Sequence, residues 1–250
     1  MAAAPSLPVS PGEPAPLSEG ERLVDTFVAP SKTFTDLRRN SSWWAPWLVI
    51  SLFSIAFMMV VGKQIGYEQV TRNQISHSAR ADQFDKLPPE QQARQLRVAA
   101  KVTKYIGFAF PAIILISFVI IAAVLMATFN LGAGADVRFG TSLAIVSYGS
   151  LPGIIHATLA MIVLFAGVDR DGFNINAPLA SNPSYFMDPS GNKFLYTLAT
   201  GLDVFMIWTI ILMGIGFACN SKVKRSNAII IVASWYVLFK LVSAGLAAMF

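Results

Sequence analysis

The chain has 250 residues, of which 54% are hydrophobic and only 13% are charged, whereas a typical soluble domain carries about 25% charged residues. This composition excludes a soluble globular domain and a disordered chain, and a single cysteine excludes a scaffold held by internal disulfides. The net charge of +5 fits basic residues that lie beside anionic lipid headgroups. The sequence contains no recognisable nucleic-acid-binding module, so we expect no nucleic acid among the partners.

Three long segments contain no Asp, Glu, Lys or Arg, namely 40–62, 105–135 and 139–168. Each is longer than the roughly 20 apolar residues that a helix needs to cross a bilayer. The sequence therefore predicts an all-α fold, a polytopic transmembrane bundle of five helices. The expected spans, of which the fourth has no clear start, lie at about 45–62, 105–129, 141–167, 199–219 and 228–249.

The N-terminal region divides into two parts before the transmembrane domain, which we place at 41–250. Residues 1–17 are rich in Pro and Ala, and we expect this tail to be disordered because it cannot bury apolar surface. In segment 18–40, apolar and charged residues follow a helical pattern that is interrupted near Pro30. We expect this segment to form a short amphipathic helix in the plane of the membrane interface.

The one sizeable soluble loop is segment 63–104, between the first two spans. Its second half predicts a helix that starts near Pro89 and continues into the second span. Four basic residues on this helix are spaced by three, four and three positions and so share one face: Arg94, Arg97, Lys101 and Lys104. This face is typical of a contact with anionic lipids, and also of an ordinary solvated face beside a span.

The third span contains small residues at every fourth position: Gly149, Gly153 and Ala157. Such a ridge lets two helices approach closely, within one molecule or between protomers. Pro152 lies within the ridge, removes one backbone hydrogen bond and is expected to kink the helix. We therefore expect these four positions to be a helix-packing site.

Three ionisable residues fall within the expected spans: His156, Asp203 and Lys240. At 1.5 Å rise per residue, Asp203 and Lys240 lie about 24 and 18 Å from the loop that joins the last two spans, which allows an intramembrane polar pair. His156 has a compatible depth. One interpretation is a relay for protons or ions; the other is a structural pair that orients helices, or a lysine that reaches the interface.

No pattern for catalysis, cofactor binding or metal binding stands out. The sequence lacks HExxH, GxSxG and any cluster of Cys and His, so we expect no catalytic residue, cofactor or metal site and no enzyme. Segment 169–176 looks like part of a calcium loop, but its first and last ligand positions would be Gly167 and Pro178. A polar turn between spans explains these residues.

Four motifs carry a family resemblance: FVAPSKTFTDL at 27–37, WWAP at 43–46, YGSLP at 148–152 and LDVFMIW at 202–208, continuing to GIG at 214–216. Together they resemble the Yip family of Ypt/Rab-interacting membrane proteins, in its bacterial branch. The resemblance covers the chain from about Glu21 onward. It implies a five-helix bundle with a cytoplasmic N-terminus and no catalytic residues to carry over.

We therefore expect a non-enzymatic membrane organiser or adaptor, with the lipid bilayer and other membrane proteins or a second copy as partners. The alternative is a small transporter or channel subunit that uses Asp203, Lys240 and His156. The resemblance indicates the bacterial cytoplasmic membrane. Seven basic residues lie near span ends on the N-terminal side and eight on the other side, so their number does not set the orientation. The compact basic cluster at 222–225 and the family resemblance favour a cytoplasmic N-terminus.

Overall fold

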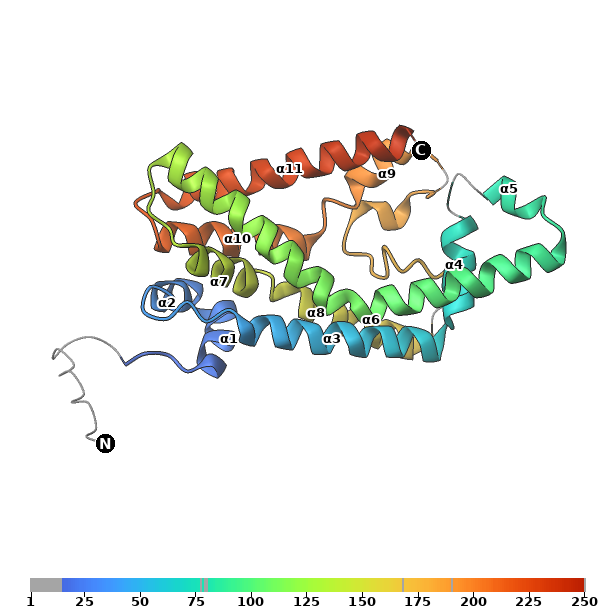
Figure 1. The fold of residues 1–250 in the computed structure, drawn as a ribbon, viewed down its shortest axis with the longest axis horizontal. Helices are drawn as coiled ribbons and strands as arrows, with labels where there is room; N and C mark the ends of the chain where they lie inside the picture. The colour runs from blue at the N-terminus through green and yellow to red at the C-terminus, as the bar shows by residue number, and fades with distance from the viewer. Residues whose placement is uncertain (1–14, 77, 79–80, 168, 190, 250) are drawn as a thin grey trace.

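The computed structural model describes residues 15–76, 78, 81–167, 169–189 and 191–249. The all-α fold is confirmed: the described residues form helices and turns and contain no strand. The helices make an elongated bundle whose long axis follows the spans (Figure 1). Most of the tail that we expected to be disordered, residues 1–14, lies outside the described residues.

The N-terminal segment forms a helical hairpin, α1 (Glu19–Val28) and α2 (Pro30–Asp36), which turns at Ala29. The hairpin packs against the ends of α7 (Phe139–Gly149) and α10 (Val204–Cys219). Several of its side chains enter the core, so part of the amphipathic segment is buried by protein.

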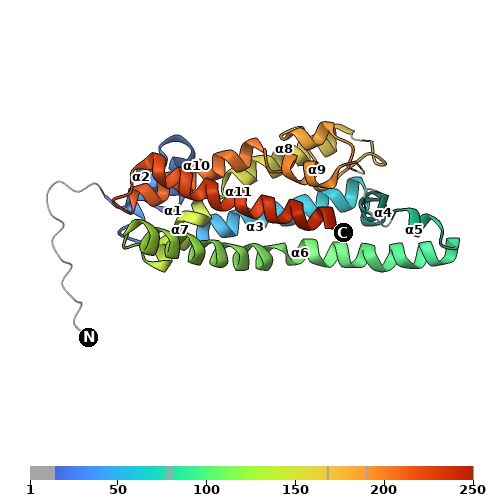
Figure 2. The ribbon, with the colours of Figure 1, turned by 90° about the horizontal axis from the view of Figure 1, so that it is seen from above.

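The first two spans pack as an antiparallel pair, α3 (Trp44–Gln64) and α6 (Pro89–Ala127). As expected, α6 runs without a break from Pro89 into the membrane-spanning part. At about 1.5 Å per residue its 39 residues measure about 58 Å, roughly twice the apolar thickness of a bilayer. Figure 2 shows its N-terminal end extending beyond the other long helices.

Short helices occupy the end of the bundle away from the hairpin: α4 (Tyr67–Ser76), α5 (Ala81–Asp85) and the 3₁₀ turn η2 (Pro183–Phe186). At the hairpin end, α6 continues into a π-helical turn, η1 (Thr128–Gly132). The chain then reverses direction in the segment 133–138, where Gly134 has a positive φ of 62°, before α7.

Two of the remaining spans are broken helices. The third consists of α7 and α8 (Pro152–Gly167), and the fourth consists of α9 (Lys193–Ala199) and α10, which meet at 56°. The last span is α11 (Arg225–Met249). Four helical segments are long and apolar enough to cross a membrane, and the bent pair makes a fifth if it is one span. The chain is therefore an integral multi-pass membrane protein.

The main core lies at the hairpin end of the bundle, where α2, α6, α7, α10 and α11 converge. Phe129 and Phe217 stack there with ring centroids 4.2 Å apart, and Tyr148 and Phe34 are fully buried. Because lipid is as apolar as these side chains, close van der Waals packing rather than the hydrophobic effect holds such helices together. The core therefore depends on small residues at the helix contacts.

Candidate functional site

The hairpin begins with a capping box. The Ser18 hydroxyl accepts a hydrogen bond from the backbone N–H of Glu21 at 3.3 Å, and the Glu21 carboxylate accepts one from the Ser18 backbone N–H at 2.8 Å. The hydrogen bonds from the Ser18 backbone and hydroxyl lower the pKa of Glu21. This box fixes the first turn of α1 directly before a buried arginine.

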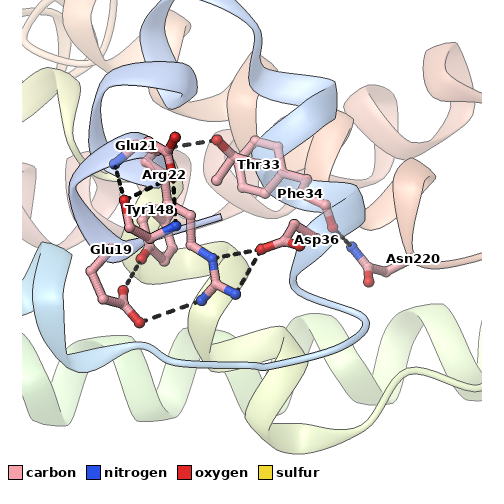
Figure 3. A network of polar contacts seen from close by, with 9 residues as sticks. Glu19, Glu21, Arg22, Thr33, Phe34, Asp36, Tyr148 and Asn220 are labelled. Carbon is pink, nitrogen blue, oxygen red and sulfur yellow. Dashed lines mark hydrogen bonds and ion pairs between the residues drawn. The ribbon is translucent and has the colours of Figure 1, made fainter. Parts of the chain in front are cut away.

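Arg22 is the centre of a buried polar network that joins the hairpin to the bundle (Figure 3). Its side chain is only 1% exposed, and its guanidinium donates to the Asp36 carboxylate from Nε at 2.8 Å and from Nη2 at 2.7 Å. A third nitrogen, Nη1, lies 3.4 Å from Glu19, and Glu19 accepts a 2.6 Å hydrogen bond from the Tyr148 hydroxyl. Through this chain of contacts, α1 is tied to both α2 and α7.

The backbone carbonyl of Arg22 also takes part. It accepts hydrogen bonds from the hydroxyls of Thr26 at 2.7 Å and Thr33 at 3.1 Å, both of which are fully buried. Burial opposes the charge of Arg22, but the hydrogen bond and the charge of Asp36, with that of Glu19, outweigh it and raise the pKa of Arg22. The arginine is therefore held charged inside the hairpin.

A glycine on α10 makes room for the hairpin. A Cβ atom added to Gly216 would lie 3.0 Å from Cδ1 of Phe34 and 2.6 Å from Cγ2 of Ile145. The Asn220 side chain then donates to the Phe34 carbonyl at 2.8 Å (Figure 3). The GIG motif thus has a packing role, because a larger residue at Gly216 would clash with Ile145 and Phe34 and displace the hairpin from α10.

The second polar cluster surrounds the break between α9 and α10. Asp203 lies at this break and caps α10, since its Oδ1 accepts hydrogen bonds from the backbone N–H groups of Phe205 at 2.9 Å and Met206 at 3.2 Å. Its other oxygen accepts hydrogen bonds from the side chains of Ser181 and Asn182. The predicted intramembrane aspartate is therefore a helix cap held by a neighbouring loop.

Two residues of α11 contact the opposite side of the same break. The Tyr236 hydroxyl donates to the Gly201 carbonyl at 2.9 Å, and the Lys240 ammonium donates to the Thr200 hydroxyl at 3.2 Å. The stem of Lys240 packs on Gly201, where an added Cβ would lie 3.1 Å from Lys240 Cγ. The described contacts therefore join Lys240 to Thr200, and none joins it directly to Asp203.

The three predicted intramembrane residues nevertheless share one neighbourhood. The Asp203 carboxylate interacts electrostatically with Lys240 and with His156. The His156 ring, on α8, meets the Phe205 ring edge-on with centroids 5.4 Å apart. The break thus gathers His156, Asp203 and Lys240 from three spans without a continuous chain of hydrogen bonds between them.

The small-residue ridge of the third span divides at Pro152, the first residue of α8. On one side of the break, a Cβ at Gly149 would lie 2.6 Å from Cγ of Met213, so α7 and α10 are in close contact there. On the other side, a Cβ at Gly153 would meet nothing within 4 Å, and Ala157 is half-buried. Within one molecule, then, Gly149 lies in a close helix contact and Gly153 does not, so packing through Gly153 would require a second molecule.

The four basic residues of α6 are all exposed, but their surroundings differ. Arg94 lines an open cavity, Arg97 donates to the Ala93 carbonyl of its own helix at 3.3 Å, and the Lys104 ammonium lies 5.9 Å from the centroid of the Tyr67 ring. Their contact with anionic lipids stays a prediction. Among the described residues, no group of three or more His, Cys, Asp and Glu is placed to hold a metal ion.

The arrangement of a docked hairpin, broken spans and a five-segment bundle can be compared with known families. The model of the Yip1 domain matches residues 24–246, which is most of the chain. The chain belongs to the Yip1 family. Yip1 proteins are generally non-enzymatic membrane proteins. The matched range includes the cluster around Asp203 and, from the first cluster, Asp36 and Tyr148, but it begins after Arg22. No curated protein and no solved structure gives a significant match.

Proposed function

We propose that this Yip1 protein is a non-enzymatic membrane adaptor of the bacterial branch, which uses its N-terminal hairpin to contact a partner at the cytoplasmic face. The buried Arg22 network is the observation that carries the proposal. It places an amphipathic segment in a fixed position on the bundle, where a contact surface is formed before a partner arrives. Such preorganisation lowers the entropic cost of binding.

The exposed surface of the hairpin supports this role. Val24 and Val28, one turn apart on α1, are 62% and 73% exposed. The same end of the bundle carries exposed basic residues of the hairpin and of the loops: Lys32, Arg38, Arg39, Arg138, Lys222, Lys224 and Arg225. Basic residues at span ends lie beside anionic headgroups, and the compact cluster at 222–225 suits the cytoplasmic leaflet of the bacterial membrane.

A photo-crosslinking residue at Val28 tests the adaptor role in cells. We expect a discrete adduct with another membrane protein or a second copy of the chain, and we expect Arg22→Met to abolish it by releasing the hairpin. The same residue at Gln83, exposed on α5 at the opposite end, is the matched control. An adduct that is unchanged by Arg22→Met would mean that the docked hairpin is not the contact surface.

A second candidate function, a small transporter or channel subunit, is favoured by the break between α9 and α10. Broken helices with polar groups at the break are typical of the substrate and ion sites of secondary transporters. Here Asp203, Lys240 and His156 supply those groups. Flux through proteoliposomes that is lost on Asp203→Asn would favour transport over the adaptor role, whereas no flux by the wild-type protein would favour the adaptor.

A further inference from the structure

The end of the bundle away from the hairpin contains an open cavity of about 1250 Å³, with walls from α4, α6, α9 and the C-terminal end of α11. We propose that this cavity binds the headgroup and upper acyl chains of one anionic phospholipid. Small-molecule pockets usually measure roughly 300–1,000 Å³, so this cavity has room for a large amphiphile rather than a single ion. The proposal is independent of the adaptor role of the hairpin.

Polar contacts between distant segments hold the walls in place. The hydroxyls of Thr71 on α4 and Thr103 on α6 lie 3.1 Å apart. The Asn73 side chain donates to the carbonyl of Phe173 at 2.9 Å, which fastens the loop after α8 to α4. Asn174 in that loop donates to the Tyr196 hydroxyl of α9 at 2.9 Å. The cavity is therefore a built feature rather than a gap between loose loops.

The charge of the lining fits an anion. Arg94 and Lys193 are the charged residues among the described lining residues, which include no Asp and no Glu. In the part of the chain that the structure describes, no hydrogen bond or ion pair engages either cationic group. Two cations that face one cavity without a carboxylate favour a negatively charged headgroup. Amide side chains nearby, from Gln95 and Asn176, offer further donors to phosphate and glycerol oxygens.

The position of the cavity along α6 puts it at the level of lipid headgroups. A Cβ at Gly107 would touch Met58 of α3, so these two residues lie side by side. Since α3 and α6 are antiparallel, the end of α3 at Gln64 lies near Lys101 of α6. The lining residues Val98 and Val102 bracket this level, which is where the apolar part of the bilayer gives way to headgroups.

The cavity also faces lipid between α6 and α11. These helices meet at the hairpin end, where the Trp235 indole donates to the Thr128 hydroxyl at 2.9 Å, and diverge toward the other end (Figure 1). Val98 and Val102 of α6 and Ala247 of α11 line the divergent part. Acyl chains can lie along these apolar residues while the headgroup meets Arg94 and Lys193, an arrangement that a soluble phosphate ester cannot use.

Native mass spectrometry of the full chain tests the proposal. The protein is purified in mild detergent with equal amounts of phosphatidylglycerol and phosphatidylcholine that have the same acyl chains. We expect one phosphatidylglycerol to be retained preferentially. Arg94→Gln with Lys193→Gln should weaken this retention roughly tenfold, because each cation near an anionic surface contributes several-fold.

The matched control is Lys86→Gln with Arg72→Gln, which removes the same charge from exposed positions at the same end but outside the cavity lining. A second variant, Ala99→Trp, fills the cavity and keeps both cations, and it should also reduce retention. The proposal would be overturned if the control variant lost as much phosphatidylglycerol as the Arg94 and Lys193 double variant. It would also be overturned if the wild-type protein retained both lipids equally. Displacement of the lipid by millimolar glycerol phosphate would assign the cavity to a soluble anion and likewise overturn it.

Discussion

The guanidinium of Arg22 and the carboxylate of Asp36 form a buried, two-pronged ion pair that closes the N-terminal hairpin, with Nη2 and Oδ2 only 2.7 Å apart. The side chains are 1% and 7% exposed, so neither charge has water to replace its partner. A buried charge without its partner is far more costly than a pair removed as a unit. Loss of one partner alone should therefore disturb the position of the hairpin.

This relationship gives the first prediction. Arg22→Met alone should destabilise the protein by about 3–5 kcal/mol, because it leaves the Asp36 charge buried without its partner. Asp36→Leu alone should cost less, because Arg22 keeps the Glu19 carboxylate at 3.4 Å. The double variant should cost clearly less than the sum of the two. Thermal unfolding in detergent, followed by tryptophan fluorescence, measures all three variants. Additive losses would show that the two side chains do not interact energetically.

The second prediction uses the two glycines on either side of Pro152. Gly149→Ala should destabilise by about 1–3 kcal/mol, since the added Cβ would lie 2.6 Å from Cγ and 3.3 Å from the backbone nitrogen of Met213. Gly153→Ala should be neutral, or stabilising by up to about 1 kcal/mol, because open space surrounds it and alanine favours helix. The melting temperatures of both variants are measured in the same detergent. An equal decrease in melting temperature for the two variants would contradict the prediction.

The sequence predicted the helical class because the charge-free segments are longer than a bilayer crossing, and Pro152 marked one of the two helix breaks. The break before Asp203 contains no proline. Its available signals were Gly201 and an aspartate directly before an apolar run, which is an N-cap pattern. Because the segment is apolar on both sides of the break, hydropathy alone favoured a span that includes Asp203.

No pattern in the sequence indicated the buried network around Arg22. An arginine on an amphipathic helix is normally exposed, and only the fold brings Asp36 and Tyr148 to Arg22. The cavity likewise could not be predicted from the sequence, because its walls come from α4, α6 and the region between α8 and α9, which are far apart in the chain. Periodicity describes one helix at a time, so it does not reveal which polar faces meet.

The third prediction concerns Asp203 and Lys240, which contact opposite sides of one helix break. Asp203→Asn and Lys240→Met should each destabilise the protein, and the double variant should cost less than their sum because it leaves neither charge uncompensated. Thr200→Val is the control, since it keeps both charges and removes the hydroxyl that accepts from Lys240 and donates to the Thr197 carbonyl. A hydrogen bond between membrane helices contributes about 0.6 kcal/mol on average. Additive effects of the charged pair would show that the two groups act separately.

The last prediction is the orientation of the chain. The hairpin and the basic residues around it occupy one end of the bundle, and α4, α5 and the first half of α6 occupy the other. The compact basic cluster at 222–225 and the docked hairpin favour a cytoplasmic position for the first end. The count of basic residues by the positive-inside rule is similar at the two ends. An experiment must therefore distinguish the ends directly.

Cysteine accessibility does so, because the chain has a single natural cysteine. In a Cys219→Ser background, Ala15→Cys places a thiol just before α1 and Gln83→Cys places one on α5, both at exposed positions. An impermeant maleimide added to intact cells should label Gln83→Cys and not Ala15→Cys, and both should react after the membrane is opened. Labelling of Ala15→Cys alone on intact cells would reverse the orientation, move the hairpin outside the cell and remove the cytoplasmic partner from the proposed function.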